Sequence, residues 1–385
     1  ELHENPVRSI KLLGEELTLF QSRSGKLGLV DRRCAHRRLD LRWGIPQKDA
    51  LRCAYHGWTY TTEGQCVDQP GEPLGSRFKD KIRISNYPVV ELGGLIWAYI
   101  GPTPIPALPR WRPLVVENAF RHVATTVLPC NWLQCMENSV DPLHAEHLHG
   151  YLWEYVVERY GEAIPNTKPA FDRLKRKHHR LEFEPFEFGI IKRRILEGQD
   201  ETASDWLHGH PLIFPNAVTL GIPGMYQIEI RVPRDDSSTW CLIYQAFVPG
   251  NGVTVPEQPF LPTYEDPVNE IPDYVAGQDL IAWRDQGTIV DRSLEQLGDS
   301  DRGLILYRRM LQEQIQVVQD GGDPINVFRT DAEAKHLVME GHEYGEWLGP
   351  YEPGTMYLRT AGPFSPVLEI IENLLTQASK SQGYS

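Results

Sequence analysis

Two short segments near the N-terminus place the tightest limit on what this chain can fold into. Cys34-Ala-His36 and Cys53-Ala-Tyr-His56 follow the pattern C-x-H-x16-C-x2-H, so each segment offers one thiolate and one imidazole. Side chains of these two types have to converge from two loops if they are to hold a metal centre. A diiron–disulfur cluster with two cysteines on one iron and two histidines on the other needs this mixed set.

A structural zinc site is the alternative, since two cysteines and two histidines also bind zinc. Zinc fingers usually pair cysteine with cysteine and histidine with histidine, whereas both segments here are mixed. We therefore expect Cys34, His36, Cys53 and His56 to bind a [2Fe-2S] cluster. The other cysteines are expected to be ordinary buried thiols: Cys66, Cys130, Cys135 and Cys241.

Length and charge limit the number of domains and the kinds of partner. A chain of 385 residues suits two domains, and 39 basic against 52 acidic side chains give a net charge of −13. This balance argues against nucleic acid or an anionic membrane as a partner. No apolar run approaches the ~18 residues of a membrane-spanning helix. Six cysteines are too few for a disulfide scaffold, so we expect a reducing, cytoplasmic compartment. Because residue 1 is Glu, the sequence leaves the true N-terminus open.

The pattern of residues predicts two domains joined by a stiff segment. The first hundred residues are strand-like, with a short apolar strand expected at 95–100. Residues 101–113 contain five prolines, which neither a helix nor a sheet accommodates. We expect an all-β domain at 1–115 and an α+β domain at 116–385. In the second domain the pattern predicts a hairpin from 226–232 and 239–248, and helices at 304–318 and 367–378.

The two ligand segments also carry a family resemblance. Cys34-Ala-His36-Arg37 and Cys53-Ala-Tyr55-His56-Gly57-Trp58 resemble the signature of Rieske non-haem iron oxygenases. Electron-transfer Rieske proteins share this signature, so a second site has to distinguish an enzyme from a carrier. The resemblance covers nearly the whole chain. It is nearest to the homotrimeric oxygenases of the phthalate-dioxygenase and aromatic O-demethylase type, especially through the stretch 131–144.

A histidine-rich segment supplies candidates for that second site. His144, His147 and His149 lie within six residues, just after Asp141. An iron(II) that activates dioxygen is typically held by two histidines and one carboxylate, with coordination positions left open. On a regular helix His144 and His147 would converge better than His144 and His149, because five residues turn the helix by about 140°.

The family resemblance favours the other pair. The family motif is an acidic residue followed by two histidines with three or four residues between them, and Asp141, His144 and His149 match it. We take His144 and His149 as iron ligands, with His147 as the alternative, and predict a distorted or bulged helix at this point. The resemblance also implies an acidic ligand on a later helix. Asp279 fits best, with Asp285 and Asp291 as alternatives.

Two further residues are assigned catalytic roles. The resemblance implies that Asp141 bridges a cluster histidine and an iron-ligating histidine, which would orient ligands and couple the two sites. Asp141 before Pro142 also suits a helix N-cap. Asn138 is a candidate hydrogen-bond donor near the iron, or a buried and satisfied amide.

The resemblance predicts how electrons arrive. Family members take them from NAD(P)H through a separate flavin reductase, sometimes with a ferredoxin, and this chain has no Gly-rich dinucleotide fingerprint. They form homotrimers in which the cluster of one subunit serves the iron of the next. Their second domain is a helix-grip fold, with a curved antiparallel sheet over a long C-terminal helix. Residues 367–378 would suit that helix.

A basic stretch surrounds the cluster segments. Residues 31–53 contain seven basic and three acidic side chains in a chain whose net charge is −13. Loop charge exposed to solvent, or ion pairs to a neighbouring subunit, is one interpretation. Our hypothesis is that part of this stretch, including Arg37 and Arg38, steers an acidic electron donor to the cluster.

The substrate is predicted only as a class. The resemblance indicates an aromatic acid or aryl ether, to be hydroxylated on the ring as a cis-diol or demethylated at a methoxy group. Pocket walls are expected from 206–225 and the strands beyond: Leu212, Phe214, Val218 and Leu220. Arg231 is a candidate anchor for a carboxylate, as are Arg234, His208 and His210. An electron carrier or a zinc-stabilised binding protein is the rival class, and it leaves the histidine-rich segment unexplained.

Overall fold

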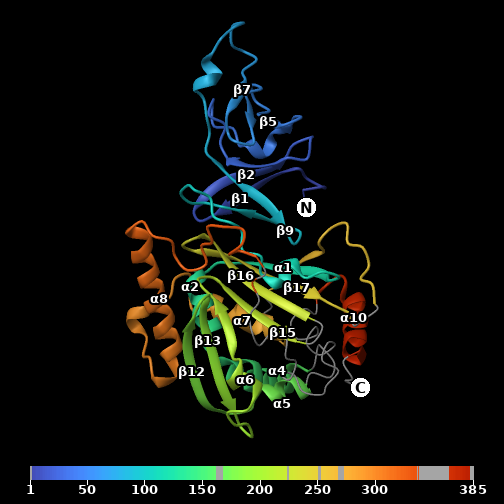
Figure 1. The fold of residues 1–385 in the computed structure, drawn as a ribbon, viewed down its shortest axis with the longest axis vertical. Helices are drawn as coiled ribbons and strands as arrows, with labels where there is room; N and C mark the ends of the chain where they lie inside the picture. The colour runs from blue at the N-terminus through green and yellow to red at the C-terminus, as the bar shows by residue number, and fades with distance from the viewer. Residues whose placement is uncertain are drawn as a thin grey trace. The chain divides into compact units, whose positions relative to one another are not determined.

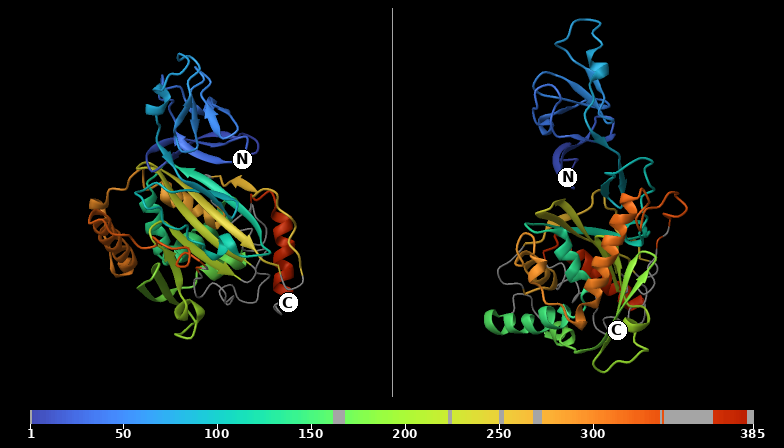
Figure 2. Two further views of the ribbon diagram at one scale, coloured as in Figure 1. Left: turned by 45° about the horizontal axis from the view of Figure 1, so that its top comes forward. Right: turned by 90° about the vertical axis from the view of Figure 1, so that its left-hand side faces the viewer.

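The computed structural model describes residues 2–161, 168–222, 225–249, 253–267, 273–335, 337 and 364–381. The chain divides into two compact units, residues 1–105 and 106–385 (Figures 1 and 2). Residues 106–115, which the sequence analysis placed in the first domain, belong to the second unit. The reason is that helix α1 (Arg112–Val115) packs against β16 (Met225–Asp235) and β17 (Ser238–Phe247) of that unit.

The described part of the first unit is all β apart from two short 3-10 turns, η1 and η2. It has two four-stranded sheets, with strand orders β1-β2-β3-β8 and β4-β5-β6-β7, and the hairpin β9-β10. The element bounds are β1 Val7–Leu12, β2 Glu15–Gln21, β3 Leu27–Asp31, η1 Leu41–Trp43, β4 Ile45–Pro46, β5 Ala50–Arg52, β6 Thr59–Thr61, β7 Cys66–Asp68, η2 Phe78–Lys81, β8 Asn86–Tyr87, β9 Val89–Leu92 and β10 Leu95–Ala98.

The core of this unit lies next to the ligand segments. Cys34 and Cys53 belong to one buried cluster with Phe20, Leu51 and Tyr60. Both thiols are thus anchored in apolar packing, which holds the two loops in fixed positions. The strand predicted at 95–100 is present as β10. It is half-buried rather than buried, because it pairs only with β9 in a two-stranded hairpin.

The second unit is built on an eight-stranded sheet. Its strand order is β12-β13-β14-β15-β16-β17-β11-β18, and every pairing is antiparallel except that of β18 with β11. The bounds of the strands introduced here are β11 Phe120–Leu128, β12 His178–Phe186, β13 Gly189–Leu196, β14 His210–Ile213, β15 Ala217–Ile222 and β18 Thr263–Glu265. The predicted hairpin is present as β16 and β17.

Strand register defines the face of the sheet that carries the second site. Leu212 pairs with Val218, Val218 with Glu229, Glu229 with Ile243, and Ile243 with Ala124. Directly paired residues point to the same side of a sheet, so these five side chains form one row across it. Ala124, Val218 and Glu229 line a cavity.

Helices cover that face and flank the sheet. Their bounds, in addition to α1, are α2 Trp132–Val140, α3 His144–Glu146, the π-helix η3 His147–Leu152, α4 Trp153–Tyr160, α5 Lys168–Leu174, α6 Ser204–Leu207, α7 Val275–Arg284, the 3-10 turns η4 Arg292–Leu294 and η5 Asp299–Asp301, α8 Arg302–Gln319 and α10 Leu368–Ser381. α8 contacts β12 and α10 contacts β17, and in Figure 1 these two helices lie on opposite flanks of the sheet.

Both helices predicted in the second domain are present. The helix predicted at 304–318 is α8, and the one predicted at 367–378 is α10. Ile371 and Leu374 of α10 pack on Phe120, Met225 and Phe247, which are cross-strand partners in one row. The C-terminal helix thus packs on an antiparallel sheet, as the fold prediction requires.

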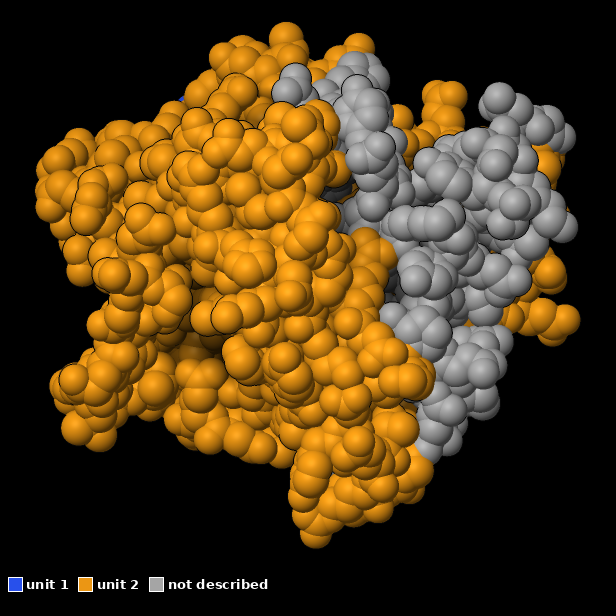
Figure 3. Space-filling view, turned by 90° about the horizontal axis from the view of Figure 1, so that it is seen from below, with its two compact units in different colours: residues 1–105 blue, residues 106–385 orange. Residues whose placement is uncertain are grey.

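Two surface properties complete the description. Among the described helices, none combines the length and the apolar run needed to cross a bilayer. Seen from below, the surface of the unit 106–385 is hollowed by a recess (Figure 3).

Candidate functional site

The two cluster segments form loops with the same backbone pattern. The N–H of Cys34 donates to Leu39 O at 2.9 Å, and the N–H of Cys53 donates to Trp58 O at 2.8 Å. The carbonyl oxygens of Cys34 and Cys53 accept from the N–H groups of Arg38 and Gly57. Arg38 and Gly57 both have positive φ, 59° and 75°, which lets each loop turn back after its histidine.

Within these loops the four side chains separate into two pairs. The thiols of Cys34 and Cys53 are buried and in hydrogen-bond contact. The rings of His36 and His56 are exposed, with centroids 4.5 Å apart. Among the described residues, these four side chains do not form a group whose ligand atoms all lie within 4.8 Å of one another. A pair of sulfurs beside a pair of imidazoles fits a two-iron cluster and not a single tetrahedral zinc.

Hydrogen-bond donors surround the Cys34 sulfur. Tyr60 Oη lies 3.2 Å from Cys34 Sγ and also accepts from the N–H of Ala35. The Cys53 thiol, then Tyr60 and the N–H groups of His36 and Arg37, lower the pKa of Cys34 to about 6, although burial acts in the opposite direction. The same contact with Cys34, together with burial, raises the pKa of Cys53, so the two thiols together favour one thiolate, the form that binds metal.

The basic stretch is partly neutralised. Arg32 forms an ion pair with Asp40 at 2.6 Å. Arg37 and Arg38 are exposed on the loop that carries His36, and the Arg37 guanidinium lies 5.3 Å from the ring centroid of Tyr55. Arg38 also lies 3.9 Å from Asp31, a long ion pair, and both guanidinium groups stay exposed next to His36.

The second group of ligands lies on a distorted helix, as predicted. Helix α2 ends at Val140, and the next two residues, Asp141 and Pro142, interrupt the helix. It resumes as α3 and continues as the π-helix η3. A π-helix bonds residue i to residue i+5, so it has more residues in each turn than an α-helix. The rings of His144 and His149 consequently meet, with centroids 5.1 Å apart. His147 points elsewhere, and its side chain is 65% exposed.

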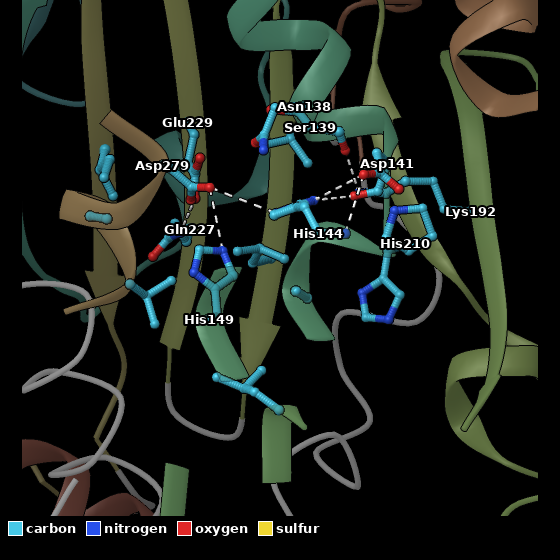
Figure 4. A pocket seen from close by; sticks show the side chains of 18 of the residues that line it. Asn138, Ser139, Asp141, His144, His149, Lys192, His210, Gln227, Glu229 and Asp279 are labelled. Atoms are coloured by element: carbon cyan, nitrogen blue, oxygen red, sulfur yellow. Dashed lines mark hydrogen bonds and ion pairs between the residues drawn. The ribbon is translucent and has the colours of Figure 1, made fainter. Parts of the chain in front are cut away.

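Asp279 of α7 completes this group (Figure 4). Its Oδ1 lies 3.3 Å from His149 Nε2 and 3.7 Å from His144 Nε2. Among the residues that the structure describes, these three form the one group of at least three potential ligands whose atoms lie within 4.8 Å of one another. Asp279 Oδ1 is buried and accepts no hydrogen bond. A buried carboxylate oxygen without a partner is costly unless a cation is bound there, so the side chains fit a metal ion.

The outer nitrogens of both histidines are held by hydrogen bonds. His149 Nδ1 donates to Gln278 Oε1 at 2.8 Å, and His144 Nδ1 donates to the carbonyl oxygen of Asp141. These bonds place the proton on Nδ1 of each ring and leave the Nε2 lone pairs facing Asp279. Metal-binding histidines are usually oriented in this way.

The electrostatics of the group also suit a divalent ion. Burial lowers the pKa of His144 to about 4, although Asp279 acts in the opposite direction. Burial raises the pKa of Asp279, but the neighbouring His149 and His144 outweigh it and the net shift is downward. Burial lowers the pKa of His149, but Asp279 and Gln278 outweigh it and the net shift is upward. The group therefore offers an ionised carboxylate and one neutral imidazole, and an iron ion would replace the proton that Asp279 favours on His149.

The alternative acids lie on the surface. Asp285 is exposed and pairs with Arg284, and Asp291 is exposed and accepts from the N–H of Ser293. Asp141 caps the start of the next helical segment, accepting from the N–H groups of Leu143 at 2.8 Å and His144 at 3.2 Å. Asp141 and Asn138 both line the cavity described next.

A cavity of about 320 Å³ adjoins the three ligands. Val218, Leu220 and Arg231 line it, as expected of substrate-contacting residues. Leu212 and Phe214 do not, and their assignment is corrected. Leu212 shares the correct face of the sheet, but Met136 and Val140 of α2 cover it. Phe214 packs in the same core, against Tyr307 of α8.

Polar side chains that the sequence analysis missed also line the cavity: Arg194, and Lys192, Gln227 and Glu229 (Figure 4). Gln227, Glu229 and Arg231 alternate with Ile228 and Ile230 along β16. This alternation of polar and apolar residues could have indicated that the three polar side chains share one face of the strand. It would not have placed them in a cavity, because a strand with one polar face usually turns that face to solvent.

Glu229 is held by a chain of buried side chains. Ser365 donates to His122 Nδ1 at 2.8 Å, and His122 Nε2 donates to Gln245 Oε1. Gln245 Nε2 donates to Gln227 Oε1 at 2.5 Å, and Gln227 Nε2 donates to Glu229 Oε1 at 2.6 Å. All donors point the same way, so the chain ends on the Glu229 carboxylate and fixes its orientation in the cavity.

The chain is similar to several known proteins. Residues 1–87 match the Rieske [2Fe-2S] domain. The chain is 38% identical to the 5,5'-dehydrodivanillate O-demethylase oxygenase subunit of Sphingobium sp. strain SYK-6, over 88% of this chain and 78% of that protein. It is 29% identical to the phthalate 4,5-dioxygenase oxygenase subunit of Pseudomonas putida, over 83% of this chain and 79% of that protein. Among solved structures, NdmA of Pseudomonas putida CBB5 has the same fold, with a TM-score of 0.60, 18% identity, and coverage of 86% of this chain and 92% of that one.

Proposed function

Because this chain belongs to the Rieske non-haem iron oxygenases, as a terminal oxygenase subunit, we propose that it hydroxylates an aromatic acid beside an iron(II) held by His144, His149 and Asp279. The convergence of two Nε2 atoms on an unpartnered carboxylate oxygen, next to a cavity, carries this proposal. The family's cofactors are a [2Fe-2S] cluster and a mononuclear iron(II), and we assign the cluster to Cys34, His36, Cys53 and His56.

The residues of the chain have separable roles in this reaction. A two-histidine, one-carboxylate site leaves coordination positions at which iron activates dioxygen. Gln278 and the Asp141 carbonyl hold the two imidazoles in the binding tautomer. The apolar side chains of Val218 and Leu220 line the cavity and favour an aromatic ring over water. Asp141 is our candidate for coupling the cluster to the iron site, because its carboxylate already lies beside His144 and faces the cavity.

Two reactions use this machinery. Cis-dihydroxylation of the ring is the first candidate, in line with the 29% identity to a phthalate dioxygenase subunit. Removal of a methyl group from an aryl ether is the second, and the 38% identity to an O-demethylase subunit favours it. The carbon that faces the iron decides between them, since both begin with oxygen transfer to a bound substrate.

Electrons have to come from another protein. The names of the related oxygenase subunits imply a separate electron-transfer partner. We propose an NAD(P)H-dependent reductase, with or without a ferredoxin, that docks near the exposed His36. None of the six cysteines, all of which lie in the described residues, forms a disulfide, and we propose a cytoplasmic location on that ground.

We further propose a homotrimer in which the cluster of one subunit reduces the iron of the next. The family resemblance and the exposed rings of His36 and His56 support this arrangement. Mixed oligomers of His36→Ala and Asp279→Ala chains test it, because each variant is inactive alone. Recovered turnover after co-expression supports transfer between subunits, and a mixture as inactive as its parents would contradict it.

Product analysis tests the reaction itself. Purified holoenzyme, a surrogate reductase and NADH are incubated with benzoate, phthalate, vanillate and 5,5'-dehydrodivanillate, and the products are identified by mass spectrometry. A cis-diol identifies ring dioxygenation, and formaldehyde with a free phenol identifies O-demethylation. Turnover of neutral aromatics alone would refute the aromatic-acid proposal.

A further inference from the structure

Two cations that line the cavity donate to carbonyl oxygens instead of carboxylates: Arg176, which donates to Glu197 O, and Lys192. Arg194 forms an ion pair with Asp205 at 2.8 Å, and Arg231 forms one with Glu229 at 2.6 Å. The Lys192 ammonium donates to the carbonyl oxygen of Ser139, a neutral group. Among the described residues, no carboxylate lies within 4.0 Å of it, so its charge is not neutralised by direct contact.

The surroundings make this charge unfavourable in the free protein. Burial, then the nearby Arg194, lower the pKa of Lys192 to about 8, while Asp141 and Glu229 act weakly in the opposite direction from beyond contact. A cation removed from water without a counter-ion is destabilising. An anion bound beside it would relieve that cost and gain a charge-assisted hydrogen bond.

The position of Lys192 suits a substrate group. It lies on β13 opposite His210 of β14, on the same face of the sheet as the cavity-lining residues of β15 and β16. Figure 4 shows Lys192 and Glu229 on opposite sides of His144. A ring held over the iron ligands would therefore have a cation near one edge and a carboxylate near the other. Lys192 is therefore the natural place for the acid group.

We propose that Lys192 binds the carboxylate of the aromatic substrate and sets the enzyme's preference for acids over neutral aromatics. The inference rests on the proposed function and adds the residue that recognises the substrate class. Among the candidates named from the sequence, Arg231 has two buried guanidinium nitrogens without a hydrogen-bond partner. Its charge is already paired with Glu229, however, and its guanidinium lies 4.8 Å from the ring centroid of Trp283, so it is less suited.

Equilibrium binding to the anaerobic holoenzyme tests the proposal without turnover. Benzoate, phthalate, vanillate and 5,5'-dehydrodivanillate are each compared with their methyl esters by isothermal titration calorimetry. The tightest acid is the probe for Lys192→Met, which removes the charge but keeps the chain length. We expect its Kd to rise at least about 10-fold, as for the loss of a charge-assisted hydrogen bond, while the Kd of its ester changes less than about 2-fold.

Two controls separate recognition from structural damage. Lys192→Arg keeps the cation and should restore most of the preference for the acid. Lys335→Met removes one exposed charge outside the cavity and should leave both Kd values unchanged. Iron content and Tm are measured for every variant, because Lys192 also contacts the end of α2 through Ser139.

The outcomes distinguish the inference from the proposed function. If Lys192→Met weakens acid and ester equally, or weakens neither, Lys192 is not the carboxylate anchor, although the enzyme still binds aromatic acids. If no acid binds the wild-type holoenzyme more tightly than its ester, the proposed substrate class fails, and the inference fails with it.

Discussion

The hydrogen bond between Gln278 and His149 gives a quantitative test of how the fold prepares the iron site. Gln278 is fully buried, and its Oε1 accepts from His149 Nδ1 at 2.8 Å. Gln278→Leu keeps most of the volume but removes the acceptor. In the iron-bound state His149 has to donate its Nε2 lone pair, so its Nδ1–H would be buried without a partner. In the iron-free state the ring can change tautomer and avoid this cost.

The penalty therefore falls mainly on the metal-bound form. An unsatisfied buried donor costs about 1–3 kcal/mol, which corresponds to a loss of iron affinity of about 5- to 150-fold. Removing a residue that hydrogen-bonds to a metal ligand typically lowers metal affinity 10- to 100-fold, which is in the same range. Competition between the protein and a chelator for iron(II), under anaerobic conditions, measures this affinity directly.

Asp285→Asn is the matched control for this experiment. Asp285 comes directly after the helix that carries Gln278, but it is exposed and paired with Arg284. The iron affinity of the Asp285→Asn variant should therefore equal that of the wild type. The visible spectrum of the [2Fe-2S] cluster should be unchanged in both variants. Gln278→Leu with an iron affinity within about 2-fold of the wild type would refute the argument that this bond orients His149.

Three further predictions test other parts of the molecule. Asp141→Asn should keep all the iron but reduce turnover about 10- to 100-fold, because the carboxylate no longer couples the two sites; normal turnover would exclude that role. Arg37→Glu should slow reduction of the cluster by its donor most at low salt, since charge steering is screened as ionic strength rises; a salt-independent, unchanged rate in stopped-flow measurements would remove the hypothesis. Burial lowers the pKa of His122 to about 4, below its model-peptide value of 6.5, so the unfolded chain binds its proton first as pH falls. The neutral His122 therefore stabilises the fold by up to about 3 kcal/mol, and this contribution is lost as the pH falls from about 6.5 to 4. In His122→Gln, the free energy of unfolding measured with urea should depend less on pH over this range. A pH dependence equal to that of the wild type would contradict the neutral, buried state of His122.

Much of the fold and the close approach of the candidate ligands within each segment could be predicted from the sequence, whereas Asp279 was found only through the family resemblance. Close spacing in the chain made this possible. Cys34 and His36 have to lie on one loop, and His144 and His149 have to lie on one helix or its distorted equivalent. The choice of His149 over His147 needed the family resemblance. A regular helix would bring His147 close to His144, and the π-helix η3 brings His149 there instead.

The cavity could not be predicted in the same way. Leu212 and Val218 are cross-strand partners and apolar, yet α2 covers one and leaves the other in the cavity. Packing between segments that are distant in the sequence determines which strand residues a helix covers. The polar and apolar pattern of the strand does not indicate this. Lys192 was missed for a related reason, since a lysine on a strand usually reaches solvent.

Iron and labile sulfide, counted in the wild type and in Asp279→Ala, test the central claim most directly. The account predicts about three irons and two sulfides per wild-type chain, falling to about two irons and two sulfides in the variant with the cluster spectrum intact. Zinc in place of iron in the wild type, or an unchanged iron count in Asp279→Ala, would contradict it.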